Sequence, residues 1–84
     1  MNTILAEIQA EYERASRKFP PFHSAHEGFA VILEEVDELK AHVWKNDAKR
    51  DMLAMRKEAI QVAAMAMRFI HDVADGPMMA GREA

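Results

Sequence analysis

The stretch from residue 26 to residue 43 has the polarity pattern of an amphipathic helix. Its apolar positions recur mostly three or four residues apart and are Phe29, Ile32, Leu33, Val36, Leu39 and Val43. This spacing places them on one core-facing stripe and predicts a helix. Ser24 is a suitable N-cap, and Glu27 three residues later completes a capping box. The helix is expected to end near Trp44-Lys45, because Asn46-Asp47 favours a turn.

A second apolar pattern predicts another long helix over residues 51–73. It begins at Asp47 or Asp51 and stops by Asp75, before Gly76-Pro77. Its apolar residues cover most of the helix circumference and are Met55, Ile60, Val62, Ala63, Met65, Ala66, Met67, Phe69 and Ile70. A helix that is apolar on so many sides should be the central, most buried one.

A first, shorter helix is predicted from Asn2 or Thr3 to Lys18, because residues before proline avoid the helical region and Pro20-Pro21 follows Phe19. The linker 19–23 is stiff and carries two aromatic residues, so we expect it to pack on the helices. No segment has the pattern of a strand. The predicted fold is therefore all-α, with two long antiparallel helices and a shorter N-terminal helix.

Composition narrows the class of protein. The 84 residues form one small domain, 1–84, with its core at about 23–75 and a short tail over 76–84. A formal charge of −3 argues against nucleic acid as the main partner. Cysteine is absent, which excludes disulfides and thiolate metal sites. Neither an apolar run of the ~18 residues that a membrane span needs nor a signal-peptide pattern is present, so we expect a cytoplasmic protein without a membrane partner.

Acidic residues interrupt the first amphipathic pattern. Four of the five residues from 34 to 38 are acidic, and Glu35 and Glu38 lie one helical turn apart on a single face. Like charges at this spacing repel each other. Glu35 also borders the apolar stripe, so its carboxylate should be partly desolvated. A positively charged partner is expected beside it.

The second long helix carries a matching pair of polar residues. Glu58 and Gln61 are one turn apart and lie beside core positions. Packed antiparallel, the two helices would bring four polar groups together, three of them carboxylates. A buried carboxylate must be paired with a cation or bind a metal. Mg²⁺ prefers hard oxygen ligands, so a carboxylate cluster suits it.

These two motifs resemble the signature of the MazG-like family of all-α nucleoside triphosphate pyrophosphohydrolases. That signature is Glu-Glu-x-x-Glu followed by Glu-x-x-Asp, and this chain has Glu34-Glu35-x-x-Glu38 and Glu58-x-x-Gln61. The run from Phe22 to Gly28 also looks like the segment that precedes the motif in small family members. The similarity covers about residues 23–73. The chain departs from the pattern at Gln61, where the family usually has Asp.

The resemblance implies a helical bundle completed by dimerisation and cleavage of a nucleoside triphosphate between its α- and β-phosphates. A homodimer or a dimer of dimers is the implied assembly, and Mg²⁺ is the implied cofactor, with Mn²⁺ as a substitute. The implied metal ligands are Glu35, Glu38, Glu58 and the amide oxygen of Gln61. Glu34, Glu35 and Glu38 are the implied catalytic residues, Glu34 acting by orienting water or a ligand.

Three residues near the inter-helix turn are candidates for substrate contacts: Trp44, Lys45 and Lys49. The lysines can meet phosphate oxygens. Trp44 can stack on a base, as can Phe22, although packing at a helix end explains an aromatic residue equally simply.

Simpler readings of the same residues stay open. The glutamates can form ion pairs with Arg56 or Arg68, and Glu34 and Asp37 can belong to a solvated face. No histidine has a convincing ligand spacing, and the Glu-x-x-His pairs of a di-iron bundle are missing. Two other classes of function therefore remain: a non-catalytic relative that binds metal or nucleotide, and a helical dimerisation module.

Overall fold

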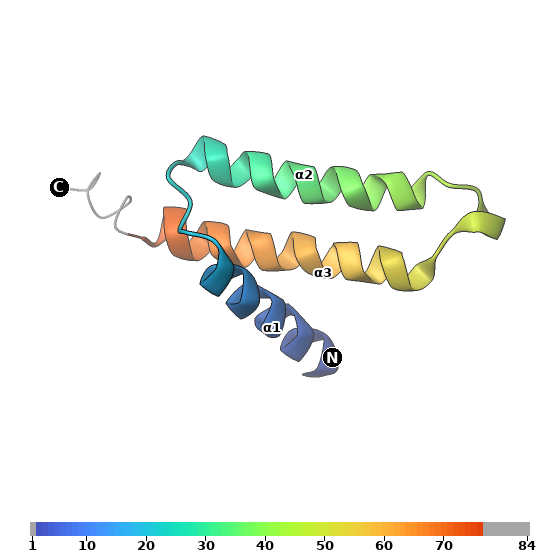
Figure 1. The fold of residues 1–84 in the computed structure, drawn as a ribbon, viewed down its shortest axis with the longest axis horizontal. Helices are drawn as coiled ribbons and strands as arrows, with labels where there is room; N and C mark the ends of the chain where they lie inside the picture. Colours follow the sequence, from blue (N-terminus) through green and yellow to red (C-terminus); the bar gives the residue numbers. More distant parts are fainter. Residues whose placement is uncertain (1, 77–84) are drawn as a thin grey trace.

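Three helices of similar length make up most of the structure. A computed structural model describes residues 2–76, with the elements α1 (Asn2–Lys18), α2 (Ala25–Val43), a 3₁₀ turn η1 (Asp47–Lys49), α3 (Met52–Phe69) and a π-helical turn η2 (Ile70–Ala74). None of these described residues forms a strand, so the prediction of an all-α fold is confirmed. Figure 1 shows α2 and α3 side by side and antiparallel, while α1 crosses α3 obliquely. The N-terminal helix is nearly as long as the other two.

The two inner helices begin at the predicted caps. The Ser24 side chain accepts a hydrogen bond from the Glu27 backbone N–H at 3.0 Å, and Asp51 accepts one from the Ala54 N–H at 3.0 Å. Each cap satisfies a backbone donor that the first helical turn leaves free. The return half of the Ser24 capping box is shifted by one residue, because Glu27 accepts from the His23 N–H at 2.6 Å.

The core lies where α3 meets both other helices, which agrees with the predicted central position of α3. Its buried residues come from α1, the linker and α3 and are Ala15, Phe22, Ala64 and Met65. Only one of the two linker aromatics packs as expected. Phe22 is buried, whereas Phe19 remains about half exposed.

Gly28 allows α2 to approach α3 closely. A Cβ atom at this position would lie 2.7 Å from Phe69 Cδ2, closer than real Cβ contacts, and 3.0 Å from Phe22 Cδ2, which is tighter than most of them. Any larger side chain would force the Phe69 ring to move and would press on the Phe22 ring. This contact fixes the spacing of the two helices at the N-terminal end of α2.

Exposed large apolar residues occur on all three helices, and three of them, Phe29, Leu33 and Val36, lie along one side of α2; we call these three residues the outer α2 face. Met52 and Leu53 in the first turn of α3 are also exposed, although α1 and α2 both pack against α3 farther along. Of the helices described, none is both long and apolar enough to cross a membrane. The predicted tail falls outside the described residues from Pro77 onward.

Candidate functional site

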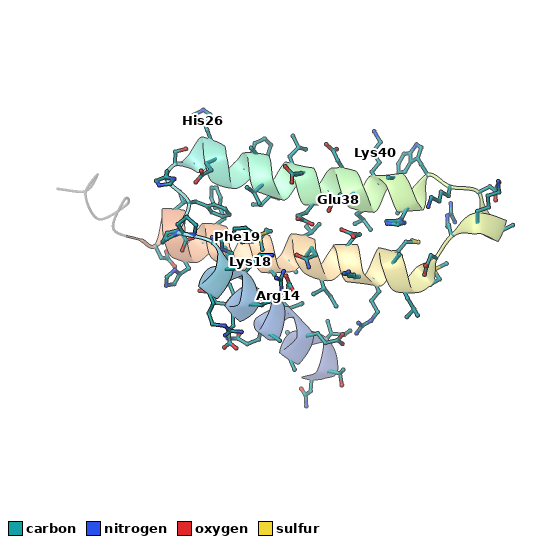
Figure 2. All side chains as sticks on the ribbon, viewed as in Figure 1. Arg14, Lys18, Phe19, His26, Glu38 and Lys40 are labelled. Carbon is teal, nitrogen blue, oxygen red and sulfur yellow. The ribbon has the colours of Figure 1, made fainter. Side chains whose placement is uncertain are left out.

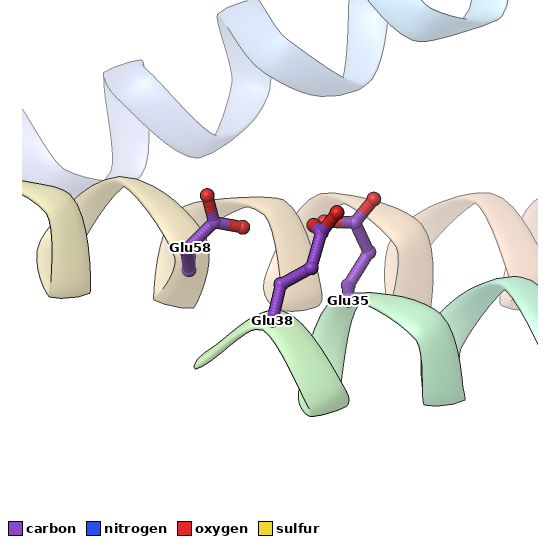
Figure 3. A group of neighbouring side chains, drawn as sticks. All are labelled: Glu35, Glu38 and Glu58. Atoms are coloured by element: carbon purple, nitrogen blue, oxygen red, sulfur yellow. The ribbon is translucent and has the colours of Figure 1, made fainter. Parts of the chain in front are cut away.

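Three carboxylates converge between α2 and α3. Glu35 and Glu38 extend from α2 one turn apart, and Glu58 extends from α3 toward them (Figure 3). One carboxylate oxygen from each residue lies within 4.8 Å of the other two. The antiparallel packing of the helices brings residue 58 beside residues 35 and 38. These three are among the four residues predicted to meet at this point.

The cluster carries unfavourable electrostatics in the metal-free protein. Burial raises the pKa of Glu35 to about 7, and the nearby charges of Glu38, Glu58 and Glu34 add to the shift. Burial and the neighbouring Glu38 also raise the pKa of Glu58. One carboxylate oxygen of Glu58, Oε2, is buried and has no hydrogen-bond partner in the described part of the chain. Such a group is costly unless something else binds it.

The two arginines considered as partners for these acids are engaged elsewhere. Arg56 Nη1 donates to Glu7 Oε1 at 2.7 Å, which ties α3 to α1. Arg68 Nη2 donates to the Pro20 carbonyl at 2.8 Å and lies 3.9 Å from Asp72 Oδ2. Within residues 2–76, no salt bridge reaches the three clustered glutamates. The ion-pair reading therefore finds no support in this arrangement.

The donor set fits a small divalent cation. Mg²⁺ binds oxygen at 2.0–2.1 Å in octahedral geometry, so its ligand oxygens are separated by about 3.0 Å when adjacent and about 4.2 Å when opposite. The observed separations of up to 4.8 Å are close to this range. Small rotations of the three side chains would bring their oxygens around one ion. The unpartnered Glu58 oxygen is the donor that such an ion would satisfy.

Glu34 and Gln61 line the same cleft as the cluster, and Gln61 also faces α1. The Gln61 amide lies beside Glu11 on α1, where it contributes to a lowered pKa of that carboxyl; the main cause is the hydrogen bond from Arg14. An amide can donate to Glu11, whereas an aspartate would repel it. This contact gives a physical reason for Gln at the position where the resembled family has Asp.

A cleft of about 520 Å³ extends from the carboxylate cluster across the face formed by all three helices. Arg14 and Lys18 reach it from α1, and Lys57 reaches it from α3. Figure 2 shows Arg14 and Lys18 on α1 where that helix passes α3, with Glu38 on the side of α2 that faces α3. Lys57 attracts both Glu11 and Glu58. The cleft thus joins an acidic cluster to basic side chains.

The end of the cleft beyond Gln61 is mainly apolar. Phe19, Phe22, Val31 and Met65 line it with Arg68 beside them, and the charged Lys18 and Glu27 stand at the same end. A cleft that combines charged groups at one end with apolar and aromatic groups at the other is typical of small-molecule sites.

Trp44, Lys45 and Lys49 do not line this cleft. They lie at the far end of the α2–α3 hairpin, where the Trp44 ring is 74% exposed and the Lys40 ammonium lies 5.6 Å from its centroid. Their proximity to the turn in sequence carried the prediction of substrate contacts. In the structure, other basic residues line the cleft, and two of them, Arg14 and Lys18, come from α1.

Sequence reasoning missed the contributions of α1 and of His42. Arg14 and Lys18 are four residues apart on one helical face, a signal that shows a basic stripe without showing what it faces. His42 follows Glu38 by four residues, so it shares the face of the acidic cluster. It lies near Glu58, where it partly opposes the raised pKa of that carboxyl, and its Nδ1 atom is buried without a hydrogen-bond partner in the region described. Its spacing from Glu38 was the available signal.

Comparison with known proteins adds no relative to this picture. No family model, curated protein or solved structure matches the chain. The resemblance noted in the sequence therefore depends on the motif residues alone, and the function has to be argued from the cleft.

Proposed function

We propose that this protein is a metal-dependent nucleoside triphosphate pyrophosphohydrolase. The observation that carries the proposal is the convergence of Glu35, Glu38 and Glu58 on one wall of a cleft that also holds basic and apolar surfaces. The order and spacing of these acids match the MazG-like motif described above. A nucleotide has the complementary parts, namely a polyphosphate that needs cations and a planar base that favours an apolar surface.

Each group of residues has a role in this reaction. Glu35, Glu38 and Glu58 hold the divalent cation, which when bound neutralises charge on the phosphate oxygens. Lys57 beside the cluster on α3, and Arg14 and Lys18 on α1, line the cleft and supply positive charge for the polyphosphate. Electrostatic positioning of this kind supplies most of the catalysis in phosphoryl-group chemistry.

Water is the nucleophile in the proposed reaction. Its oxygen attacks one of the two phosphorus atoms that flank the α–β bridging oxygen, and the bond to that bridge breaks. The products are a nucleoside monophosphate and pyrophosphate. Glu34 lines the cleft outside the clustered trio, so it is the carboxylate proposed to orient the water and accept its proton.

The test is release of pyrophosphate from a panel of ribo- and deoxyribonucleoside triphosphates. We expect hydrolysis of at least one of them with Mg²⁺, and none in the presence of chelator. Glu38→Gln should reduce the rate by several orders of magnitude with unchanged helix content by circular dichroism, because it removes a metal ligand. Glu13→Gln, an exposed change on α1, is the matched control and should leave the rate intact. Equal activity in chelator would exclude the metal mechanism.

Two further outcomes separate the alternative classes. Binding of Mn²⁺ without pyrophosphate release from any triphosphate would indicate a non-catalytic relative. Absence of both would indicate that the bundle serves only for assembly.

We also propose that the chain forms a homodimer through the outer α2 face. Its three apolar residues lie along one side of α2. Among the described residues, no other helix packs against that side. A contiguous exposed apolar patch of this kind marks an interface. A dimer of dimers would need a second patch, and Met52 and Leu53 at the hairpin end supply exposed apolar surface for one.

A further inference from the structure

Arg68 is the only charged residue that is almost completely buried in the described structure. It is 3% exposed and lies near the C-terminal end of α3. Its guanidinium carbon sits 4.5 Å from the centroid of the Phe22 ring, and Nη2 donates to the Pro20 carbonyl at 2.8 Å. These contacts hold the linker between α1 and α2 against α3.

Most hydrogen-bond donors of Arg68 have no good acceptor. A guanidinium carries five N–H donors in a fixed plane. Its Nε atom is buried and has no partner within the described residues, and Nη1 contacts only the Met65 sulfur at 3.9 Å. Asp72 supplies the nearest opposite charge, 3.9 Å away. Buried donors without acceptors are rare and require an explanation.

The position of Arg68 suggests what would supply an acceptor. It lines the same cleft as the carboxylate cluster, ten residues after Glu58 on α3, which corresponds to about 15 Å along the helix. Phe22, Val31 and Met65 line the cleft near it, together with the charged side chains of Lys18 and Glu27. The carboxylate cluster and Lys57 lie toward the opposite end. A ligand group seated against Arg68 would meet apolar and aromatic surface and guanidinium donors without acceptors, so a planar group with a hydrogen-bond acceptor fits there.

We propose that Arg68 is a specificity-determining residue whose guanidinium donates to a carbonyl oxygen of the nucleobase. The inference rests on the proposed function, which places the polyphosphate at the carboxylate end of the cleft. Guanine carries a carbonyl at O6 and thymine one at O4, whereas adenine carries an amino group at the equivalent edge. The substrate class is thus a nucleotide with an oxo-bearing base, and adenine nucleotides are disfavoured.

Calorimetric binding of nucleoside monophosphates without metal tests the proposal. Inosine and adenosine monophosphates form a matched pair, since they differ where a carbonyl replaces an amino group. We expect the wild type to bind the inosine compound, or a guanosine or uridine compound, at least about tenfold more tightly than the adenosine compound, the range of one charge-assisted hydrogen bond. Equal affinity for all of these bases would overturn the proposal.

Two substitutions identify the residue responsible. Arg68→Met should abolish the base preference, and Arg68→Lys, which retains the buried charge without the planar donors, should reduce it strongly if the methionine variant fails to fold. Glu13→Gln, an exposed change on α1 away from Arg68 and from the cleft lining, is the control and should keep the preference. Loss of preference in Glu13→Gln, or its retention in both Arg68 variants, contradicts a direct role.

Inorganic pyrophosphate separates this role from phosphate binding. Its affinity should be unchanged in Arg68→Lys, and a loss as large as that for the monophosphates would show that Arg68 binds phosphate. Base-selective binding without hydrolysis would support Arg68 and contradict the proposed function. Hydrolysis without base selectivity would support the proposed function and contradict the role of Arg68.

Discussion

At the scale of single residues, the carboxylate cluster lowers the stability of the fold when no cation is bound to it. Glu35, Glu38 and Glu58 would be more stable apart, because each ionised group disfavours the others and burial disfavours all charge. Within residues 2–76, no arginine or lysine forms a salt bridge with any of the three. Two measurable consequences follow, one for the dependence of stability on pH and one for Gln61.

The first prediction concerns pH. Folding raises the pKa of Glu35 from 4.5 to about 7, so the folded state binds more protons than the unfolded state between these values. The free energy of unfolding of the metal-free protein should therefore fall as pH rises from about 4.5 to about 7, and then level off. The shift of Glu58 acts in the same direction. We expect about 1 kcal/mol, allowing for solvent screening of a partly exposed group.

Urea unfolding at pH 5, 6, 7 and 8 measures this dependence. Glu35→Gln should flatten the pH dependence of the free energy of unfolding, whereas Glu13→Gln should not. Both variants keep the same histidines, so the histidine contribution cancels when the two are compared. Mn²⁺ should stabilise the wild type, more so at higher pH, because it binds only the folded protein and the ionised carboxylates. A stability that rises with pH through this window would contradict the electrostatic account of the cluster.

The second prediction concerns Gln61→Asp. The new carboxylate would lie beside Glu11 in place of an amide donor, so the metal-free protein should lose about 1 kcal/mol of stability. Glu11→Gln in the same chain should restore it. The added negative charge should also tighten Mn²⁺ binding by calorimetry. If neither stability nor affinity changes, Gln61 lies outside the site.

At the scale of the helices, the site depends on how closely α2 and α3 approach. Gly28 sets this distance at one end, and the three carboxylates meet farther along the same helix pair. Gly28→Ala should therefore destabilise the protein, even though alanine favours a helix by about 1 kcal/mol over glycine. Overpacking against Phe69 and Phe22 should outweigh that gain and leave a net loss of about 1–2 kcal/mol.

Chemical denaturation of Gly28→Ala and of Ala41→Gly tests the packing argument. Ala41 is exposed on the same helix, so its change to glycine should cost about 1 kcal/mol through helix propensity alone. Both substitutions should thus destabilise the protein, although one adds a methyl group and the other removes one. A more stable Gly28→Ala protein would show that the two rings move aside without cost.

At the scale of the whole molecule, the outer α2 face predicts a dimer. Light scattering at micromolar concentration should give twice the chain mass for the wild type and a monomer for Leu33→Lys, which places a charge among Phe29 and Val36. Leu5→Lys, an exposed change on α1, is the control and should leave the mass unchanged. A monomeric wild type would contradict the dimer proposal.

The same variant separates assembly from metal binding. Glu35, Glu38 and Glu58 all come from one chain, so monomeric Leu33→Lys should still bind Mn²⁺. Loss of metal binding on dissociation would mean that the cluster depends on a second chain.

The sequence by itself determined the features that depend on neighbouring residues. Ser24 and Asp51 cap α2 and α3, the prolines end α1, and the turn between Glu35 and Glu38 places both carboxylates on one face. Capping and helical periodicity act over three or four residues, so the printed order of amino acids is enough to predict them.

Only the tertiary structure decided which distant surfaces meet. It put Arg14 and Lys18 of α1 in the cleft, left Trp44 outside it, and buried Arg68 against the linker. Helical spacing shows which residues share a face, but the partner of that face depends on packing between segments far apart in the chain. That is the physical reason why the one-turn spacing of Glu35 and Glu38, and of Glu58 and Gln61, could be predicted from the sequence, whereas the basic and apolar walls of the cleft could not.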